Sequence, residues 1–380
     1  MSFSELGLSA PLLALIAKNA YTAPYPIQVA AIPAILSGKD VLGIAQTGSG
    51  KTASFVLPIL QQFQEKKAAK NRFVKALILV PTRELAVQVG EVFKTFSQNL
   101  PRPVKCLAVF GGVSINPQMI QMQGVEVLIA TPGRLLDLSE NNAMNLSEID
   151  ILVLDEADKM LNMGFKEEMS RIFRLLPTKR QNLLFSATLG KDINTITEML
   201  LHDPVKIEIE QEVQNLDLIK QLAYFVTDER KGPLLRYLIK SQGMKQVLVF
   251  TSSVHKADSV AHKLKINGIK ALAMHSDKSQ GARTEALRYL KSGEINVLVA
   301  TDLVSRGIDI PTLPIVINYE LPRSPKDFIH RIGRTGRAGA EGEAISFVLK
   351  EEEPHFYVIQ KKMGRRVELK ETDELNLRGF

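Results

Sequence analysis

The stretch Leu152–Asp158, LVLDEAD, decides the fold. Its apolar half is typical of a buried strand, and it ends in the carboxylates Asp155, Glu156 and Asp158. Charge at the mouth of a core strand costs solvation free energy, so the pattern indicates a site that manages a metal ion or a water. A solvated helix cap is the alternative for these acids taken alone.

A second stretch, Ala45–Thr52, reads AQTGSGKT and matches a phosphate-binding loop except that alanine replaces its first glycine. It follows an apolar strand and precedes the helical pattern of Ala53–Leu60. Such a loop offers backbone N–H groups to phosphates, a lysine charge and a hydroxyl for Mg²⁺. Paired with LVLDEAD, it predicts an ATP·Mg²⁺ site in which Asp155 holds Mg²⁺, partly through water, and Glu156 orients the attacking water.

Short apolar runs alternate with longer amphipathic stretches along the chain, which predicts βαβ units and parallel sheets. The runs LILV and VLVF, and likewise VLIAT and VLVAT, recur at the same offset in the two halves, which indicates two similar α/β domains. The polar stretch near residues 208–216 is the predicted linker, between a first domain of residues 1–207 and a second of 217–380. The predicted strands are Val41–Ala45, Leu77–Val80, Val127–Ala130, Ile151–Leu154, Leu183–Ser186, Val247–Phe250, Ala271–Met274, Val297–Ala300 and Ile315–Asn318.

Charge and composition narrow the class of partner. The 380 residues carry a net charge of +7, which favours an acidic partner, nucleic acid first, although a merely basic enzyme fits as well. One cysteine, Cys106, excludes an intrachain disulfide and fits a reducing compartment such as the cytoplasm. No apolar run reaches the roughly 18 residues of a membrane helix.

The second half contains a basic run, HRIGRTGR, at residues 330–337. That half has no phosphate-binding loop of its own, so its arginines are candidates to reach a γ-phosphate held by the other domain. A solvated basic face is the alternative.

At these residues the chain resembles the DEAD-box RNA helicases of helicase superfamily 2, closest to the compact bacterial RhlE-like group. The family's motifs stand in order along the chain. They are Phe3 with AYTAPYPIQ ending at Gln28, AQTGSGKT (45–52), PTREL (81–85), Gly111–Gly112, TPGR (131–134), DEAD (155–158), SAT (186–188), VFTSS (249–253), QGAR (280–283), ATD (300–302), RGID (306–309) and HRIGRTGR (330–337).

The resemblance implies two tandem RecA-like domains with ATP in the cleft between them, and a role for each matching position. The implied catalytic residues are Asp155, Glu156, Lys51, Arg334 and Arg337. The implied ATP-binding residues are Phe3, Tyr21, Gln28, Ala45, Gln46, Thr47, Gly48, Ser49, Gly50, Lys51, Thr52 and Asp309, of which Thr52 also binds Mg²⁺ together with Asp155. Coupling between the ATP and RNA sites is implied for Asp158, Ser186, Thr188 and His330. RNA backbone contacts are implied for Arg83, Gly112, Thr131, Arg134, Arg283 and Thr301.

The resemblance also implies the activity, RNA-stimulated ATP hydrolysis coupled to local unwinding of short duplexes or remodelling of RNA–protein complexes. An ATP-gated RNA clamp that unwinds little and a translocating DNA motor remain open alternatives. Backbone contacts predict little sequence specificity. A monomer acting in ribosome assembly or RNA decay is the expected setting. Ala20 and Tyr25 depart from the family pattern, and Tyr25 stands where a small hydroxyl residue is common.

Overall fold

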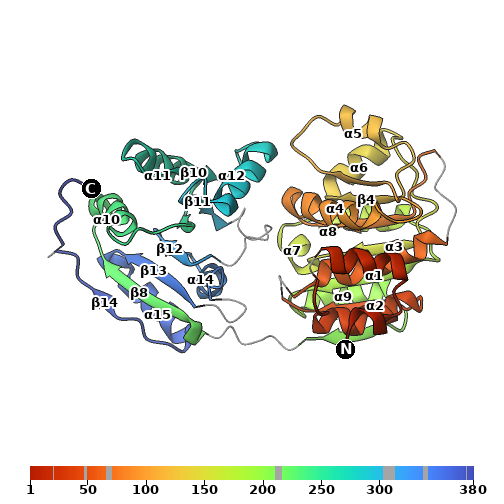
Figure 1. Ribbon diagram of the computed structural model, residues 1–380, viewed down its shortest axis with the longest axis horizontal. Coiled ribbons are helices and arrows are strands. Elements are labelled where there is room, and N and C mark those ends of the chain that lie inside the picture. Colours follow the sequence, from red (N-terminus) through yellow and green to blue (C-terminus); the bar gives the residue numbers. More distant parts are fainter. Residues whose placement is uncertain are drawn as a thin grey trace. The chain divides into compact units, whose positions relative to one another are not determined.

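The computed structural model describes residues 1–19, 21–46, 49–65, 71–209, 216–302, 313–336, 341–373 and 375–380. The chain divides into two compact units, Met1–Gln211 and Glu212–Phe380, each of which has its own sheet and core (Figure 1). The predicted linker, residues 208–216, starts at the last residue of a strand of unit 1, and residues 210–215 lie outside the described ones. The linker and its exact boundaries therefore stay predictions.

The sheet of unit 1 has seven described strands in the order β3-β4-β2-β5-β6-β1-β7, and every pair is parallel. Every residue of β1, β2, β4 and β5 is buried, as expected for parallel strands covered on both faces. The strands are β1 (Val41–Ile44), β2 (Ala76–Leu79), β3 (Cys106–Val109), β4 (Val127–Ala130), β5 (Ile151–Leu154), β6 (Gln181–Ser186) and β7 (Val205–Glu208).

Helices cover the two faces of this sheet and enclose two hydrophobic clusters. One face packs against the 3-10 helix η1 (Phe3–Leu6) and against α1 (Ala10–Lys18), α2 (Pro26–Leu36), α3 (Lys51–Gln64) and α4 (Arg83–Ser97). The other face packs against α6 (Pro132–Glu140), α7 (Ala157–Asn162), α8 (Lys166–Leu175) and α9 (Lys191–Leu200), with α5 (Asn116–Gln121) at the same side. Because side chains alternate along a strand, Ile151 and Val153 enter the first cluster and Leu152 and Leu154 the second.

Unit 2 repeats the design, with seven described parallel strands in the order β10-β11-β9-β12-β13-β8-β14. The strands are β8 (Ile219–Phe225), β9 (Val247–Thr251), β10 (Ala271–Met274), β11 (Val297–Thr301), β12 (Ile315–Asn318), β13 (Gly342–Val348) and β14 (Leu369–Lys370). One face packs against α10 (Asp228–Ser241) and α11 (Val254–Ile266), and the other against α12 (Gln280–Ser292), α14 (Pro325–Ile332) and α15 (Glu353–Met363). The 3-10 helices η2 (Leu216–Leu218) and η3 (Lys350–Glu352) precede β8 and α15.

Several helices that follow strand ends begin at a hydroxyl residue that caps them. The side-chain oxygen of Thr82 accepts a hydrogen bond from the N–H of Leu85 at the start of α4. Ser253, Ser279 and Ser324 do the same for α11, α12 and α14. These caps satisfy N–H groups that have no partner within the helix, so the sequence itself marks where each loop ends.

The predicted fold class of two parallel sheets flanked by helices is confirmed, and each predicted strand is present within one or two residues of its predicted bounds. The recurring apolar runs are equivalent in space, since β2 and β9 are third in their sheets and β4 and β11 are second. Among the described residues, no helix is long and apolar enough to cross a membrane.

Candidate functional site

The candidate residues of unit 1 gather at one edge of its sheet. In a parallel sheet all strands end at the same edge, and ligands bind there. The loop after β1 and the acids Asp155 and Glu156 after β5 belong to the predicted ATP site, and the residues at the end of β6 are predicted to couple it to the RNA site. The residues after β2, β3 and β4 belong to the predicted RNA site. The strand order β3-β4-β2-β5-β6-β1 therefore places the RNA candidates along one half of this edge and the ATP candidates along the other.

The predicted phosphate loop joins the end of β1 to the start of α3. Gly50 is the N-cap of α3 and has a φ of 88°, a conformation that favours glycine. Lys51 is 6% exposed, and its ammonium donates a hydrogen bond of 2.6 Å to the carbonyl oxygen of Ala45. The Ser49 hydroxyl donates to the carbonyl of Gln46 at 2.7 Å. Thr47 and Gly48 lie outside the described residues.

The acids after β5 are buried beside this loop. Asp155 is 2% and Glu156 4% exposed. Burial raises the pKa of Asp155 to about 6, while the charge of Lys51 opposes that rise. Glu156 has a φ of 54°, an uncommon conformation for a residue with a side chain, and its carboxylate lies 2.7 Å from the ammonium of Lys159.

The residues present fit a magnesium ion bound together with phosphates. The Oδ1 atom of Asp155 is buried and has no hydrogen-bond partner among the described residues, and Thr52 is partly buried at the start of α3. The described residues contain no group of three or more His, Cys, Asp or Glu side chains that could hold an ion alone. Mg²⁺ does not need such a cluster, because it commonly binds through one or two carboxylates together with substrate phosphates and water.

The predicted adenine-binding residues lie next to the phosphate loop. Gln28 is 1% exposed; its Oε1 accepts from the N–H of Tyr25 at 2.9 Å, and its Nε2 donates to the carbonyl of Gly50 at 3.0 Å. Phe3 is buried, and its ring packs edge-on against Tyr21, which packs edge-on against Phe96. Phe3 therefore supports Tyr21 from within the core.

The predicted coupling residues of unit 1 form a short chain of hydrogen bonds. The hydroxyl of Ser186 donates to the carbonyl of Thr188 at 2.9 Å, and the hydroxyl of Thr188 donates to the carboxylate of Asp158 at 3.1 Å. The loop after β6 is thus tied to α7, which begins directly after Glu156. These hydrogen bonds connect the segment that follows β5 to the end of β6.

The RNA candidates of unit 1 include two residues in very close contact. Gly112 has a φ of 76°, and a Cβ atom added there would overlap the guanidinium of Arg83. Arg134 is 7% exposed, donates to the carbonyl of Val113 at 2.8 Å and has a buried Nη1 atom without a partner among the described residues. Thr131 is 8% exposed at the N-terminus of α6.

In unit 2 the candidates also follow strand ends. Arg283 is 5% exposed in the first turn of α12, after β10, and Thr301 is the last residue of β11. His330 is exposed on α14, and Arg334 is 8% exposed just after that helix. Asp309 and Arg337 lie outside the described residues.

Arg331 is a residue that sequence reasoning did not single out within the basic run. It is 2% exposed and binds both carboxylate oxygens of Asp302, at 2.6 and 2.7 Å. It also donates to the carbonyl of Glu320 at 2.6 Å and stacks 4.9 Å from the ring centre of Phe250. Its neighbours come from β9, β11 and β12, so it ties three strand ends to α14. Nothing in the local sequence separates it from Arg334.

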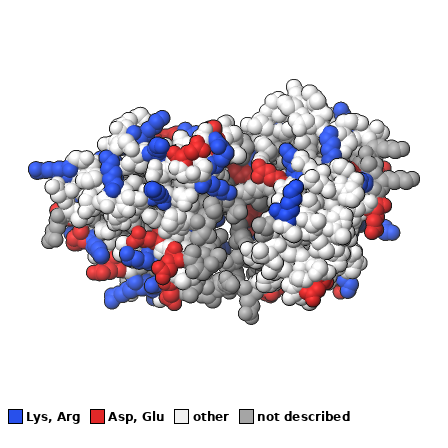
Figure 2. Space-filling model, in the orientation of Figure 1, with Lys and Arg blue, Asp and Glu red and all other residues white. Residues whose placement is uncertain are grey.

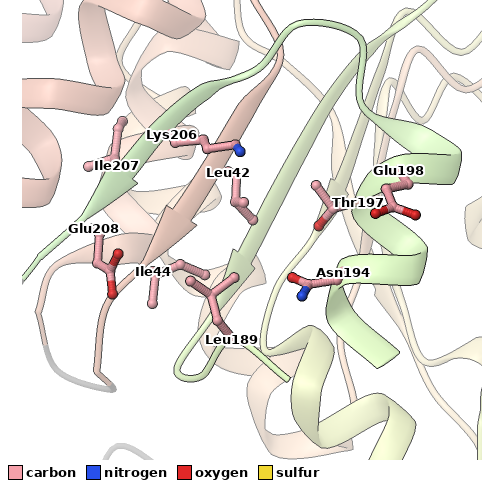
Figure 3. Close-up of a pocket in the computed structure, with 9 residues that line it drawn as sticks. All are labelled: Leu42, Ile44, Leu189, Asn194, Thr197, Glu198, Lys206, Ile207 and Glu208. Carbon is pink, nitrogen blue, oxygen red and sulfur yellow. The ribbon is translucent and has the colours of Figure 1, made fainter. Parts of the chain in front are cut away.

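A surface cavity of ≈ 350 Å³ lies on the α9 side of the sheet (Figure 3). Leu42 and Ile44 of β1, Lys206 and Glu208 of β7, and side chains of α9 line it. None of the predicted site residues belongs to this lining. The cavity nevertheless borders the strand-end site, because Ile44 directly precedes the phosphate loop and Leu189 directly follows Thr188.

Two family matches cover most of the chain. Residues 25–196 match the family described as DEAD/DEAH box helicase, and residues 230–339 match the helicase conserved C-terminal domain. These segments contain the strand-end residues of unit 1 and unit 2, respectively.

Relatives and solved structures agree with these two family matches. The chain is 39% identical to the ATP-dependent rRNA helicase RRP3 of Meyerozyma guilliermondii, over 96% of this chain and 76% of that protein. It is 39% identical to the DEAD-box ATP-dependent RNA helicase RhpA of Helicobacter pylori, over 99% of this chain and 75% of that protein. The S. cerevisiae Dbp5 structure bound to RNA and ADP BeF3 matches with a TM-score of 0.81 and 32% identity, covering 98% of this chain and 96% of that chain. The chain belongs to the DEAD-box family of ATP-dependent RNA helicases.

Proposed function

We propose that this helicase couples RNA-stimulated ATP hydrolysis to local, non-processive unwinding of short RNA duplexes or to remodelling of RNA–protein complexes. The observation that carries the proposal is the buried Asp155 carboxylate beside Lys51, with an oxygen that has no hydrogen-bond partner among the described residues. A buried carboxylate with such an oxygen can bind a cation that arrives together with the phosphates of a nucleotide. The same sheet edge carries the RNA candidates.

In this proposal the phosphate loop binds ATP through its N–H groups, Lys51 and Thr52, and Gln28 reads the adenine edge. Glu156 orients the attacking water and accepts its proton. Asp155 and Thr52 hold Mg²⁺, which when bound neutralises charge on the phosphates. Arg334 and Arg337 complete the site from the second unit, and Asp309 contacts the ribose.

RNA contacts come from polar groups at strand ends, Arg83, Gly112, Thr131 and Arg134 in unit 1 and Arg283 and Thr301 in unit 2. Lys and Arg are interspersed with Asp and Glu over the described surface that Figure 2 shows. On the face shown, the support for RNA binding therefore comes from local donors and not from one broad basic field. Contacts to phosphates imply weak sequence preference and a strong dependence on salt.

In this proposal, ATP binding and RNA binding are coupled because each ligand binds both units and favours the same closed state. Each ligand then tightens the binding of the other by the same factor. Closure brings Arg334 to the phosphates and bends one RNA strand, so that its partner strand leaves. The Ser186–Thr188–Asp158 chain and His330 transmit the state of the ATP site to the RNA site. Hydrolysis reverses the closure.

A biological setting is proposed from the relatives. One of them, RRP3 of Meyerozyma guilliermondii, is named an rRNA helicase, which favours ribosome assembly over RNA decay. We propose that the chain acts as a monomer in a reducing compartment such as the cytoplasm, consistent with its one partly buried cysteine.

The first experiment compares steady-state ATP hydrolysis without nucleic acid, with single-stranded RNA and with DNA of the same sequence, at low and moderate salt. Strong stimulation by RNA alone supports the proposal, and strand separation is then measured on a short duplex. Equal stimulation by DNA contradicts it in favour of a DNA motor. Stimulation with long RNA residence but little strand separation contradicts it in favour of a clamp.

The Glu156→Gln variant tests the assigned base. We expect ATP and RNA affinities near those of the unchanged protein and a loss of turnover of about 10²–10⁴-fold. Glu167→Gln, on the exposed side of α8, is the matched control and should hydrolyse ATP normally. Unchanged turnover in Glu156→Gln rules out the assigned role.

A further inference from the structure

Tyr25 occupies a position that does not suit tyrosine as a helix cap. It is the N-cap of α2, where Ser, Thr, Asp or Asn supplies an oxygen to the first free N–H groups. Tyr25 makes no such side-chain hydrogen bond. Only the reciprocal half of a capping box is formed, in which its own N–H donates to Oε1 of Gln28 at 2.9 Å. The tyrosine side chain therefore contributes little to starting the helix.

The ring of Tyr25 lies instead against the phosphate loop. A Cβ atom placed on Gly50 would be 2.8 Å from Cδ2 of Tyr25 and 2.6 Å from Nε2 of Gln28. The ring and the glutamine amide thus meet at the same glycine, directly before Lys51. The ring also lies near Tyr21, whose pKa is raised by burial and further by Tyr25.

The three aromatic residues at this corner differ in how accessible they are. Phe3 is 5% exposed, and Tyr21 is held between the rings of Phe3 and Phe96. Tyr25 is 52% exposed, so much of its ring is free to contact a ligand. A ring that served only to pack the core would be covered.

We propose that Tyr25 is a specificity-determining residue that forms an aromatic wall for the base of the nucleotide held by the phosphate loop. This inference rests on the ATP site proposed above. The ring supplies apolar and π contact to a purine, while Gln28 supplies hydrogen bonds beside it. Because the contact is made to the base, it affects nucleotides and not the phosphates alone.

The test measures binding of ADP and of pyrophosphate by calorimetry with the full chain. Tyr25→Thr removes the ring and restores a capping hydroxyl, and Tyr25→Leu keeps apolar bulk without the ring. We expect each to bind ADP about five- to tenfold more weakly, about 1.0–1.4 kcal/mol, and to bind pyrophosphate as before. Tyr25→Phe should bind both as the unchanged protein does. Tyr25→Thr should also melt at the same or a higher temperature, because threonine caps the helix.

Matched controls distinguish a failure of the aromatic wall from a failure of the proposed ATP site. Tyr357 on α15 of unit 2 is 59% exposed, so Tyr357→Thr should leave ADP binding unchanged. Lys51→Ala should weaken the binding of both ADP and pyrophosphate. If it weakens the binding of neither, the ATP site itself is wrongly placed. If Lys51→Ala behaves as expected but Tyr25→Thr and Tyr25→Leu bind ADP normally, the aromatic wall is wrong. An equal loss of affinity for ADP and for pyrophosphate in the Tyr25 variants also overturns the aromatic wall, because the ring would then only support the conformation of the phosphate loop.

Discussion

At the scale of single residues, the Asp155 carboxyl shows the cost of preparing a site for a ligand. Burial raises its pKa from an ordinary value of 3.8 to about 6, with Lys51 opposing and Glu156 adding to the rise. The folded protein therefore binds the Asp155 proton more tightly than the unfolded chain does. Its contribution to stability is fully present below about pH 4 and is lost as the pH rises through about 6.

Asp155→Asn should consequently stabilise the ligand-free protein at neutral pH. The gain at pH 7.5 is expected to be up to about 3 kcal/mol, and smaller at pH 4.5, where Asp155 is protonated anyway. Urea unfolding in EDTA at the two pH values measures it, with the exposed Glu167→Gln as control. A variant that is no more stable than the unchanged protein at pH 7.5 would show that the carboxylate is compensated in the fold.

Gly112 is a second residue at which the surrounding structure permits only glycine without strain. Gly112→Ala would force a side chain into a φ of 76° and against the Arg83 guanidinium. We expect about 1 kcal/mol of lost stability, roughly tenfold weaker binding of single-stranded RNA, and a slope of log K against log salt reduced by about 0.7 for one lost phosphate contact. Fluorescence anisotropy at several salt concentrations measures the RNA affinity and the slope, and urea unfolding measures the stability.

Gly124→Ala is the control for backbone strain. Gly124 has a similar φ of 70°, but nothing lies within 4 Å of its Cβ position. It should lose similar stability and bind RNA normally. Equal RNA affinity in the two variants would remove Arg83 and Gly112 from the RNA site.

At the scale of elements, the strand ends of unit 2 are held together by one buried arginine. Arg331 of α14 binds Asp302 after β11, the carbonyl of Glu320 after β12 and the ring of Phe250 in β9. A planar guanidinium can make all these contacts at once, whereas a lysine cannot. Thr301 is the last residue of β11, so its position relative to the ends of β9 and β12 depends on this contact.

Arg331→Ala should leave the Asp302 carboxylate without its buried cation and destabilise unit 2 by about 3–5 kcal/mol. Hydrogen exchange read by mass spectrometry should show faster exchange in β9, β11 and β12 and unchanged exchange in β1–β7. Arg288→Ala removes an exposed ion pair with Glu294 and should cost less than about 1 kcal/mol. If both variants exchange alike, Arg331 does not organise these strand ends.

At the scale of the whole molecule, two sheets with equivalent strand orders carry different chemistry at their edges. The phosphate loop and the acids belong to unit 1, and Arg334 belongs to unit 2. If turnover needs residues of both units, as we propose, it can respond to RNA, because RNA that favours the proposed closed state would then also favour hydrolysis.

Arg334→Ala should therefore abolish RNA-stimulated hydrolysis, by about 10³–10⁵-fold, and change ATP affinity little. Single-turnover hydrolysis with saturating RNA, together with nucleotide titration, measures both quantities. Arg366→Ala, an exposed arginine of the same unit, serves as control. Surviving stimulation in Arg334→Ala would mean that unit 2 contributes no cation to the phosphates.

Much of this organisation could be predicted because it rests on local patterns. Apolar runs such as Val127–Ala130 and Ile315–Asn318 marked strands. The strands β3, β7, β8, β13 and β14 lie outside the predicted set. β7 shows why: its burial alternates, so no continuous apolar run marks it.

By itself, the sequence determined the parallel α/β architecture, the two repeated units, and the chemical groups at the strand ends, because these depend on short-range periodicity and on residue type. Only the tertiary structure decided the sheet order that separates ATP candidates from RNA candidates, the inward turn of Arg331 and the contact of Tyr25 with Gly50. Each of these joins residues distant in the chain or distinguishes identical side chains by burial. Pairing between distant strands and the burial of one arginine rather than another are set by how whole elements pack, which no local pattern encodes.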